Sequence, residues 1–161
     1  MLGRFLALAA LLLLLAAIQV NPPGWASLAG SQPDLLLLLV VLVGFLRGLR
    51  AGMIVGFVAG LVQGALLGAW IGPWAAAKTV AGWAGGLASA RMFRDHWAVP
   101  VACVVFATCL HNGIFWLLAH PAPLAQALRL TALTALYNAL VTPFLLAFLA
   151  STKRWILPTR T

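Results

Sequence analysis

The sequence predicts an all-α integral membrane protein, a compact bundle of six transmembrane helices. Of its 161 residues, 64% are hydrophobic and only 7% are charged, whereas soluble domains are about half apolar and about a quarter charged. One apolar stretch carries a glycine at every fourth position from residue 52 to residue 72. The connections between apolar runs are too short to hold a soluble domain. Any function must therefore lie within the bilayer or at its surfaces.

Six apolar runs, separated by charges or by Pro and Gly, are expected to form one transmembrane domain over residues 1–161. The expected spans are 4–20, 34–46, 51–71, 74–90, 97–119 and 124–150. The first run also resembles a secretory signal, with a basic start followed by an apolar run. No clean small-x-small cleavage site follows it, since Leu15 stands where a small residue is needed before Ala17. We therefore expect this run to remain as the first helix.

The second span, 34–46, is short. Its length corresponds to roughly 20 Å of helix, too little to cross a hydrocarbon core of about 30 Å alone. Ser31 or Asp34 is expected to cap its first amides. Interrupted short spans line binding sites in some transporters, but they also occur as plain packing solutions, and the sequence leaves both readings open. The preceding outer segment, 21–32, has no readable role.

The third span, 51–71, contains the glycine ladder. In lipid, helices associate through close packing, and glycine lets two backbones approach each other. Each step of four residues turns the row by about 40° round the helix, so the ladder predicts at least two neighbouring helices. The glycines expected to contact a partner's transmembrane helix are Gly52, Gly56, Gly60, Gly64 and Gly68.

The fourth and fifth spans are supported mainly by their apolar character. Several tryptophans near the predicted helix ends are expected to form an interfacial aromatic belt. They are Trp25, Trp70, Trp74, Trp97 and Trp155. Cys103 and Cys109, both in the fifth span, are expected to serve packing, because a metal site needs more ligands at recognisable spacing.

The sixth span, 124–150, carries a polar face. Its Thr and Asn side chains recur at three- and four-residue spacing and are expected to hydrogen-bond to polar groups of the third and fifth spans. The expected polar network comprises Gln63, His111, Asn112, Thr131, Thr134 and Asn138. Two interpretations stay open: a buried network that holds helices together, or a small polar cavity for a substrate. Within the network, Asn138 is expected to bond to His111 or Asn112.

The distribution of basic residues predicts orientation. Under six spans, eight of the ten Lys and Arg residues fall on one side, and only Lys78 and Arg129 lie near the other. The positive-inside rule then places both termini in the cytoplasm of a multi-pass plasma (inner) membrane protein. Anionic membrane lipids are sufficient partners for the net charge of +8, so no nucleic acid is expected.

The sequence contains none of the common motifs of proteases, hydrolases or nucleotide-binding enzymes. The two carboxylates, Asp34 and Asp95, are expected at opposite membrane faces and cannot form an acid/base pair. The chain has no HExxH, no GxSxG and no Gly-rich phosphate loop followed by Lys and Ser or Thr. We therefore expect no enzyme activity, no metal site and no cofactor.

Two stretches resemble the rod shape-determining protein MreD family. The first runs from Pro33 to Arg91, with the glycine-rich core GFVAGLVQGALLG. The second is LTALYNALVTPFLLAFLASTKR, in which Asn138 is followed by Pro143 and a basic end. Many members of that family have an aspartate where Gly64 stands here, so any role of that carboxylate is in doubt.

The resemblance implies a membrane scaffold of the bacterial cell-wall elongation machinery that maintains rod shape. It implies binding to the transmembrane helix of MreC and, indirectly, links to MreB, RodA and a class B penicillin-binding protein. It also implies a fold similar to the S components of energy-coupling-factor transporters. The alternative function is therefore an S-component-like vitamin uptake protein, although the first span lacks the Ala-x-x-x-Ala pair typical of those components.

Overall fold

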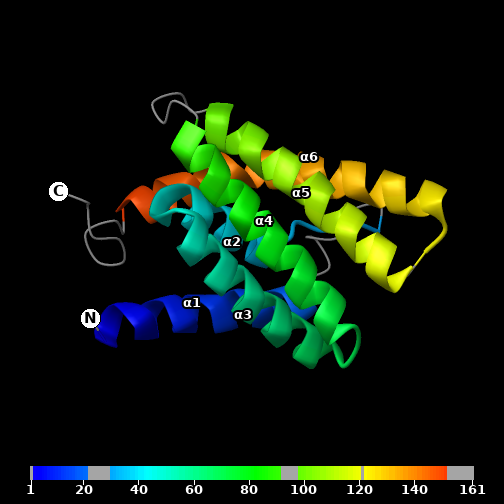
Figure 1. Cartoon of the computed structure of the whole chain (residues 1–161), viewed down its shortest axis with the longest axis horizontal. Coiled ribbons are helices and arrows are strands. Elements are labelled where there is room, and N and C mark those ends of the chain that lie inside the picture. The colour runs from blue at the N-terminus through cyan, green and yellow to red at the C-terminus, as the bar shows by residue number, and fades with distance from the viewer. Residues whose placement is uncertain (1, 22–29, 92–97, 121, 152–161) are drawn as a thin grey trace.

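The computed structural model describes residues 2–21, 30–91, 98–120 and 122–151. These residues form a nearly all-helical bundle (Figure 1). Its helices are α1 (Leu2–Val20), α2 (Leu35–Arg47), α3 (Leu49–Leu67), α4 (Ile71–Arg91), α5 (Ala98–Ala119) and α6 (Leu124–Ser151). Three of the described helices, α3, α5 and α6, are long and apolar enough to cross a membrane. The predicted fold class, an all-α membrane protein, is confirmed.

The short helix α2 forms the centre of the bundle. It has 13 residues and contacts each of the other helices. Its residues from Leu36 to Phe45 are all buried, which explains why the helix is apolar all round. Asp34 caps it, as predicted, by accepting a hydrogen bond from the Leu37 amide at 2.8 Å. The other helices therefore enclose α2 along its length.

The outer helices pack on opposite sides of this centre. α1 contacts α2 and α3, whereas α6 contacts α5 and α2. In Figure 1, α1 runs along one side of the bundle, and α5 and α6 lie together on the other. The start of α1 and the end of α6 lie toward the same end of the molecule (Figure 1).

The helices α3 and α4 form an antiparallel hairpin through the glycine ladder. Gly52 lies against the backbone of Gly82, Gly56 against Lys78, Gly60 against Ala75 and Gly64 against Ile71. A methyl group added at any of these four ladder positions would overlap backbone atoms of α4. The close contact that the ladder predicts is therefore present, but its occupant is α4 of the same chain. The expectation that these glycines bind a partner's helix is corrected accordingly.

The ladder has two neighbours, as its pitch predicts. α4 follows the row from Gly64 to Gly52, and α2 joins it at Gly52, which lies against the Cα of Gly44. The predicted continuation to Gly68 is wrong. Gly68 adopts a φ of +66°, ends α3 and leads into the turn before α4, and glycine suits this left-handed backbone because it has no Cβ.

Candidate functional site

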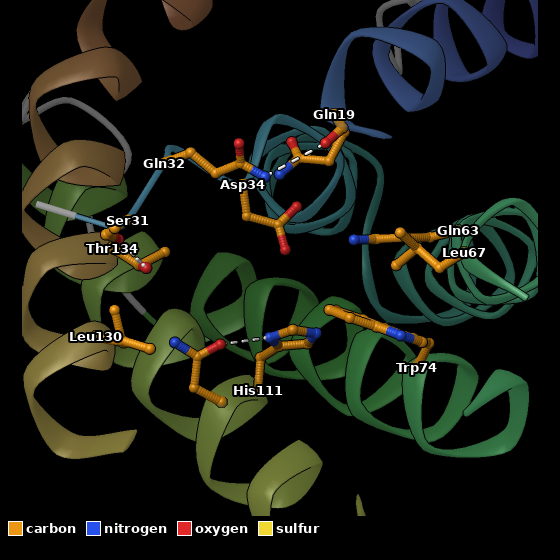
Figure 2. A pocket seen from close by; sticks show the side chains of 12 residues that line it. Gln19, Ser31, Gln32, Asp34, Gln63, Leu67, Trp74, His111, Leu130 and Thr134 are labelled. Carbon is orange, nitrogen blue, oxygen red and sulfur yellow. Dashed lines mark hydrogen bonds between the residues drawn. The ribbon is translucent and has the colours of Figure 1, made fainter. Parts of the chain in front are cut away.

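A polar pocket of about 250 Å³ lies among α1, α3, α4, α5, α6 and the segment that precedes α2. It lies at the last turn of α1, the start of α2, the end of α3, the start of α4, the second half of α5 and the first half of α6. Figure 2 shows the side chains arranged round a common space, with Asp34, Gln63 and His111 entering from different helices. Its lining residues are Gln19, Gly30, Ser31, Gln32, Asp34, Gln63, Leu67, Trp74, His111, Asn112, Leu130 and Thr134.

A buried ion pair lies beside this pocket. The Nζ of Lys78 lies 2.8 Å from Oδ2 of Asp34, and the Lys78 side chain is fully buried. The same ammonium lies 5.5 Å from the centre of the Trp74 ring, within the range of a cation–π contact. An isolated charge would be very unfavourable here, so each charged group depends on the other. The carboxylate also caps α2, which fixes its position.

Asn138 connects three parts of the site. Its Oδ1 accepts from the backbone N–H of Asp34 at 2.9 Å, and its Nδ2 donates to the Thr108 hydroxyl at 3.0 Å. The side chain is fully buried. It therefore joins α6 to α5 and to the start of α2. The expectation that Asn138 bonds to His111 or Asn112 is wrong, because Thr108, one turn earlier on α5, faces it instead.

Two more polar contacts hold the segment before α2. The hydroxyls of Ser31 and Thr134 lie 2.8 Å apart, which ties this segment to α6. On the other side, the Gln19 side-chain oxygen accepts from the Leu35 amide at 2.9 Å, and the Gln32 side chain donates to the Gln19 carbonyl at 3.3 Å. The segment therefore forms one wall of the pocket and is held by both outer helices.

Three buried polar atoms at the pocket have no hydrogen-bond partner among the described residues. They are Oε1 of Gln63, Nε1 of Trp74 and Nε2 of His111. The other ring nitrogen of His111 bonds to the Asn112 side-chain oxygen at 3.0 Å. The great majority of buried polar side-chain atoms in proteins have a partner. Three such atoms belong to side chains that line one pocket, which makes this region the candidate site.

A second pocket of about 210 Å³ adjoins the first between α5 and α6. Asn112, Leu130 and Thr134 line both pockets, whereas Thr131 lines only the second. Phe115, which also lines the second pocket, lies 4.1 Å from Trp74 between ring centres. An aromatic wall therefore stands next to the polar lining.

The predicted polar network is divided by the structure. Four of its members line the first pocket: Gln63, His111, Asn112 and Thr134. Asn138 does not line it and instead hydrogen-bonds to the backbone of Asp34. Thr131 belongs to the neighbouring pocket. The ladder glycines from Gly52 to Gly64 pack against α4.

Sequence reasoning missed Lys78 and the roles of Gln19 and Trp74. Trp74 was expected in the interfacial belt, yet its ring lines the pocket. A signal for Lys78 was present, because a Lys and an Asp within apolar spans usually pair and often mark a functional site. Asp34, expected at a membrane face, is instead buried in that pair. Asp95, which is expected at the opposite membrane face, lies outside the described residues. Within those residues, no group of three or more His, Cys, Asp or Glu could hold a metal ion.

Comparison with protein families gives a match to the model of 5TM-5TMR_LYT, described as the 5TMR of 5TMR-LYT, over residues 1–152. The comparison with curated proteins and the comparison with solved structures found no significant match. The family match overturns the MreD resemblance and the scaffold function drawn from it, and it gives no support to vitamin uptake. The expected partners MreC, MreB, RodA and a class B penicillin-binding protein rested on that resemblance alone.

The physical reason for the wrong assignment is that glycine-rich helices and Asn- and Pro-containing helices recur in unrelated membrane bundles, since the same packing needs select them. The match covers nearly the whole chain, including all six helices of the structure. The chain therefore belongs to the 5TM-5TMR_LYT family, the five-transmembrane receptor domains of LytS-type histidine kinases.

Proposed function

We propose that this chain is the membrane-embedded sensory part of a signalling receptor, and that it detects a small polar molecule in the pocket. The observation that carries the proposal is a pocket lined by three side chains, Gln63, Trp74 and His111, each of which has a buried polar atom without a partner among the described residues. The family to which the chain belongs consists of membrane sensory domains. The chain itself performs no catalysis in this proposal, and its output comes from a histidine kinase region in the same protein or in a partner.

The proposed orientation places the chain in the plasma membrane, with both termini in the cytoplasm and the pocket toward the outer side. Arg47 and Arg50 lie at the turn between α2 and α3, at the opposite end of α2 from Asp34. Basic turns favour the cytoplasmic side, where anionic lipids also attract them. The 13 residues of α2 span roughly 20 Å of a core of about 30 Å. The pocket then lies about 10 Å below the outer surface of the core.

This orientation can be tested by cysteine labelling. Cys103 and Cys109 are first replaced by alanine, and Gly72→Cys and Arg50→Cys are made separately. Both positions are exposed, and a Cβ at Gly72 meets open space. A membrane-impermeant maleimide should label residue 72 in intact cells and residue 50 only after permeabilisation. The reverse pattern would contradict the proposed orientation.

The contacts at the pocket suggest how a bound ligand could change the position of α6 at the cytoplasmic side of the membrane. α6 is joined to the pocket wall through Thr134 and Asn138, and it then runs toward the end of the bundle where α1 begins (Figure 1). A ligand that changes the position of the segment before α2 would therefore shift α6. Helix shifts of about 1–2 Å are a common means of transmission.

The direct test measures kinase output. The chain is fused through α6 to the dimerisation and catalytic region of a histidine kinase and reconstituted in nanodiscs. Autophosphorylation from ATP is measured against a panel of small amino acids, sugars, organic acids and amides. At least one compound should change the rate by about fivefold or more, and Gln63→Leu should reduce that change. A fusion that autophosphorylates but responds to no compound in the panel would contradict the sensory function.

A further inference from the structure

We infer that the two adjoining pockets bind one small amphipathic molecule, with a neutral hydrogen-bonding group in the first pocket and a ring-sized apolar group in the second. The inference names the ligand class for the sensory site and rests on the proposed function for its biological meaning. Three observations carry it: the shared boundary of the two pockets, the different chemistry of their walls, and the charges that reach the space.

The two pockets share a boundary. Asn112, Leu130 and Thr134 line both pockets, and all three are half-buried. The rings of Trp74 in the first pocket and Phe115 in the second lie 4.1 Å apart between centres. The two volumes, about 250 and 210 Å³, are each below the range of about 300–1,000 Å³ that is usual for small-molecule pockets, whereas together they reach it. One molecule that spans both pockets therefore fits this space better than one confined to either.

The second pocket presents a mainly apolar surface. Its wall includes two aromatic side chains of α5, Phe115 and Trp116, which face Ala127 and Leu130 of α6 across the space. Nε1 of Trp116 donates to the Ala122 carbonyl at 2.8 Å, so this indole has no free donor and offers a ligand its apolar surface. A cavity of about 150 Å³ lined by apolar side chains can bind benzene, and this pocket is larger. It therefore suits a ring-sized apolar group.

The first pocket supplies hydrogen-bonding groups instead. Figure 2 shows the carboxylate of Asp34 and the side-chain nitrogen of Gln63 directed toward the space. A carboxylate accepts hydrogen bonds, and an amide nitrogen donates them. A ligand group that both donates and accepts, such as a hydroxyl, can therefore bond to these two side chains.

The charges at the site favour a neutral ligand. Of the described Lys, Arg, Asp and Glu residues, only Asp34 lines either pocket. Its charge is balanced by Lys78, whose fully buried Nζ lies 2.8 Å away. An anionic ligand would meet the Asp34 carboxylate, and a cationic ligand would add a second positive charge beside a carboxylate that is already paired. Either arrangement leaves a charge poorly compensated in a buried setting, whereas a neutral group leaves the ion pair intact.

The test separates the two parts of the ligand. The full chain in nanodiscs is photolabelled with an aryl-diazirine derivative of benzyl alcohol, and the labelled residues are identified by mass spectrometry. Label should reach residues that line the second pocket, and phenylethyl alcohol should displace it saturably. Ethylbenzene and ethanol, which each carry only one part, should displace the label at least about tenfold less at equal concentration in the bilayer. Phenylacetate and phenethylamine, which carry a charge, should also displace it at least about tenfold less.

Three results would overturn the inference. The first is displacement by ethylbenzene or ethanol that equals displacement by phenylethyl alcohol, because one pocket alone would then account for binding. The second is equal or stronger displacement by either charged analogue. The third is label that phenylethyl alcohol does not displace, as expected if the probe only dissolves in the lipid.

Two variants test the two pockets separately. Ala127→Phe fills the second pocket from α6, and Gln63→Leu removes the amide donor from the first; each should raise the Kd for phenylethyl alcohol about tenfold or more. The matched control is Ala132→Phe, which adds the same ring on the exposed face of α6 and should leave the Kd unchanged. Gln63→Leu should fold at least as well as the parent, because it removes a buried oxygen without a partner among the described residues. An unchanged Kd in either pocket variant would overturn the assignment of that part of the ligand.

Failure of this inference and failure of the sensory function give different results. If a compound of the panel drives kinase output while phenylethyl alcohol does not bind saturably, the ligand class is wrong and the sensory function stands. If phenylethyl alcohol binds with the predicted dependence on Ala127 and Gln63, but neither it nor any compound of the panel changes the kinase rate, the site is real and the sensory function is wrong.

Discussion

The α3–α4 hairpin and the polar pocket lie next to each other but differ in packing: the hairpin is closely packed, whereas the pocket leaves an open space. Along the hairpin, glycines bring two backbones together so closely that no methyl group fits. At the pocket, a space of about 250 Å³ remains, and three of the side chains that line it have buried polar atoms without partners among the described residues. Lys78 belongs to both regions, because its backbone packs on Gly56 while its side chain pairs with Asp34. The comparison suggests that the closely packed hairpin holds in place the charge round which the pocket is built.

The largest expected effect comes from breaking the ion pair. Lys78→Met should lower the free energy of unfolding by about 3–5 kcal/mol, because it leaves the Asp34 carboxylate buried without its partner. Adding Asp34→Asn, which keeps an oxygen to cap α2, should recover much of that loss. Unfolding in mixed detergent micelles measures Lys78→Met, Asp34→Asn and the double variant. A double variant whose loss equals the sum of the two single losses would show that the groups are independent.

Filling the hairpin contact should have the next largest effect. Gly56→Ala should lower the free energy of unfolding by about 1–3 kcal/mol, because the added methyl group overlaps the Lys78 backbone. The matched control is Gly113→Ala on α5, where a Cβ meets open space and alanine favours the helix by about 1 kcal/mol. The two substitutions should therefore change thermal stability in opposite directions. Equal effects would contradict the close contact between α3 and α4.

A smaller loss is expected from Asn138→Leu. It removes the bonds to Asp34 and Thr108 and should destabilise the fold by about 1–2 kcal/mol, the range for buried hydrogen bonds with modest net value. The residue to which Asn138 is energetically coupled distinguishes the observed contact with Thr108 from the contact with His111 or Asn112 expected from the sequence. Asn138→Leu should be non-additive with Thr108→Val and additive with Asn112→Leu in double-mutant cycles. Coupling to Asn112 alone would contradict the structure.

The smallest effect should have the opposite sign. Gln63→Leu replaces a buried side chain whose Oε1 has no partner among the described residues, so it should stabilise the protein without ligand by up to about 1 kcal/mol. Thermal unfolding without ligand checks the sign. A clear destabilisation would indicate that Gln63 has a structural partner, and the contrast between the hairpin and the pocket would then be weaker.

Much of the fold could be predicted from the sequence because its signals are local. Apolar run lengths predict the helices, Asp34 before a leucine run predicts the start of α2, and glycines at every fourth position predict a close helix contact. The spacing of the glycines does not specify which helix packs against them. Ala75 and Gly82 on α4 are also small and provided that signal, since two rows of small residues can face each other across a tight turn.

The site was only partly predictable because it depends on long-range contacts. The polar face of α6 and His111 indicated a network, and four of its six members do reach the pocket. The pairing of Asp34 with Lys78 joins residues 44 positions apart, and no local pattern specifies it. Trp74 was misplaced because a tryptophan at a helix start is typical of a membrane interface, whereas here the tight turn after Gly68 directs α4 and its ring inward.

The most direct test of the account is whether the pocket can be reached from the outer side of the membrane. Thr134→Cys, in a chain with Cys103 and Cys109 replaced by alanine, places a thiol in the pocket lining. We predict that a small impermeant thiol reagent modifies this cysteine in intact cells. Modification only from the cytoplasmic side would contradict the proposed receptor.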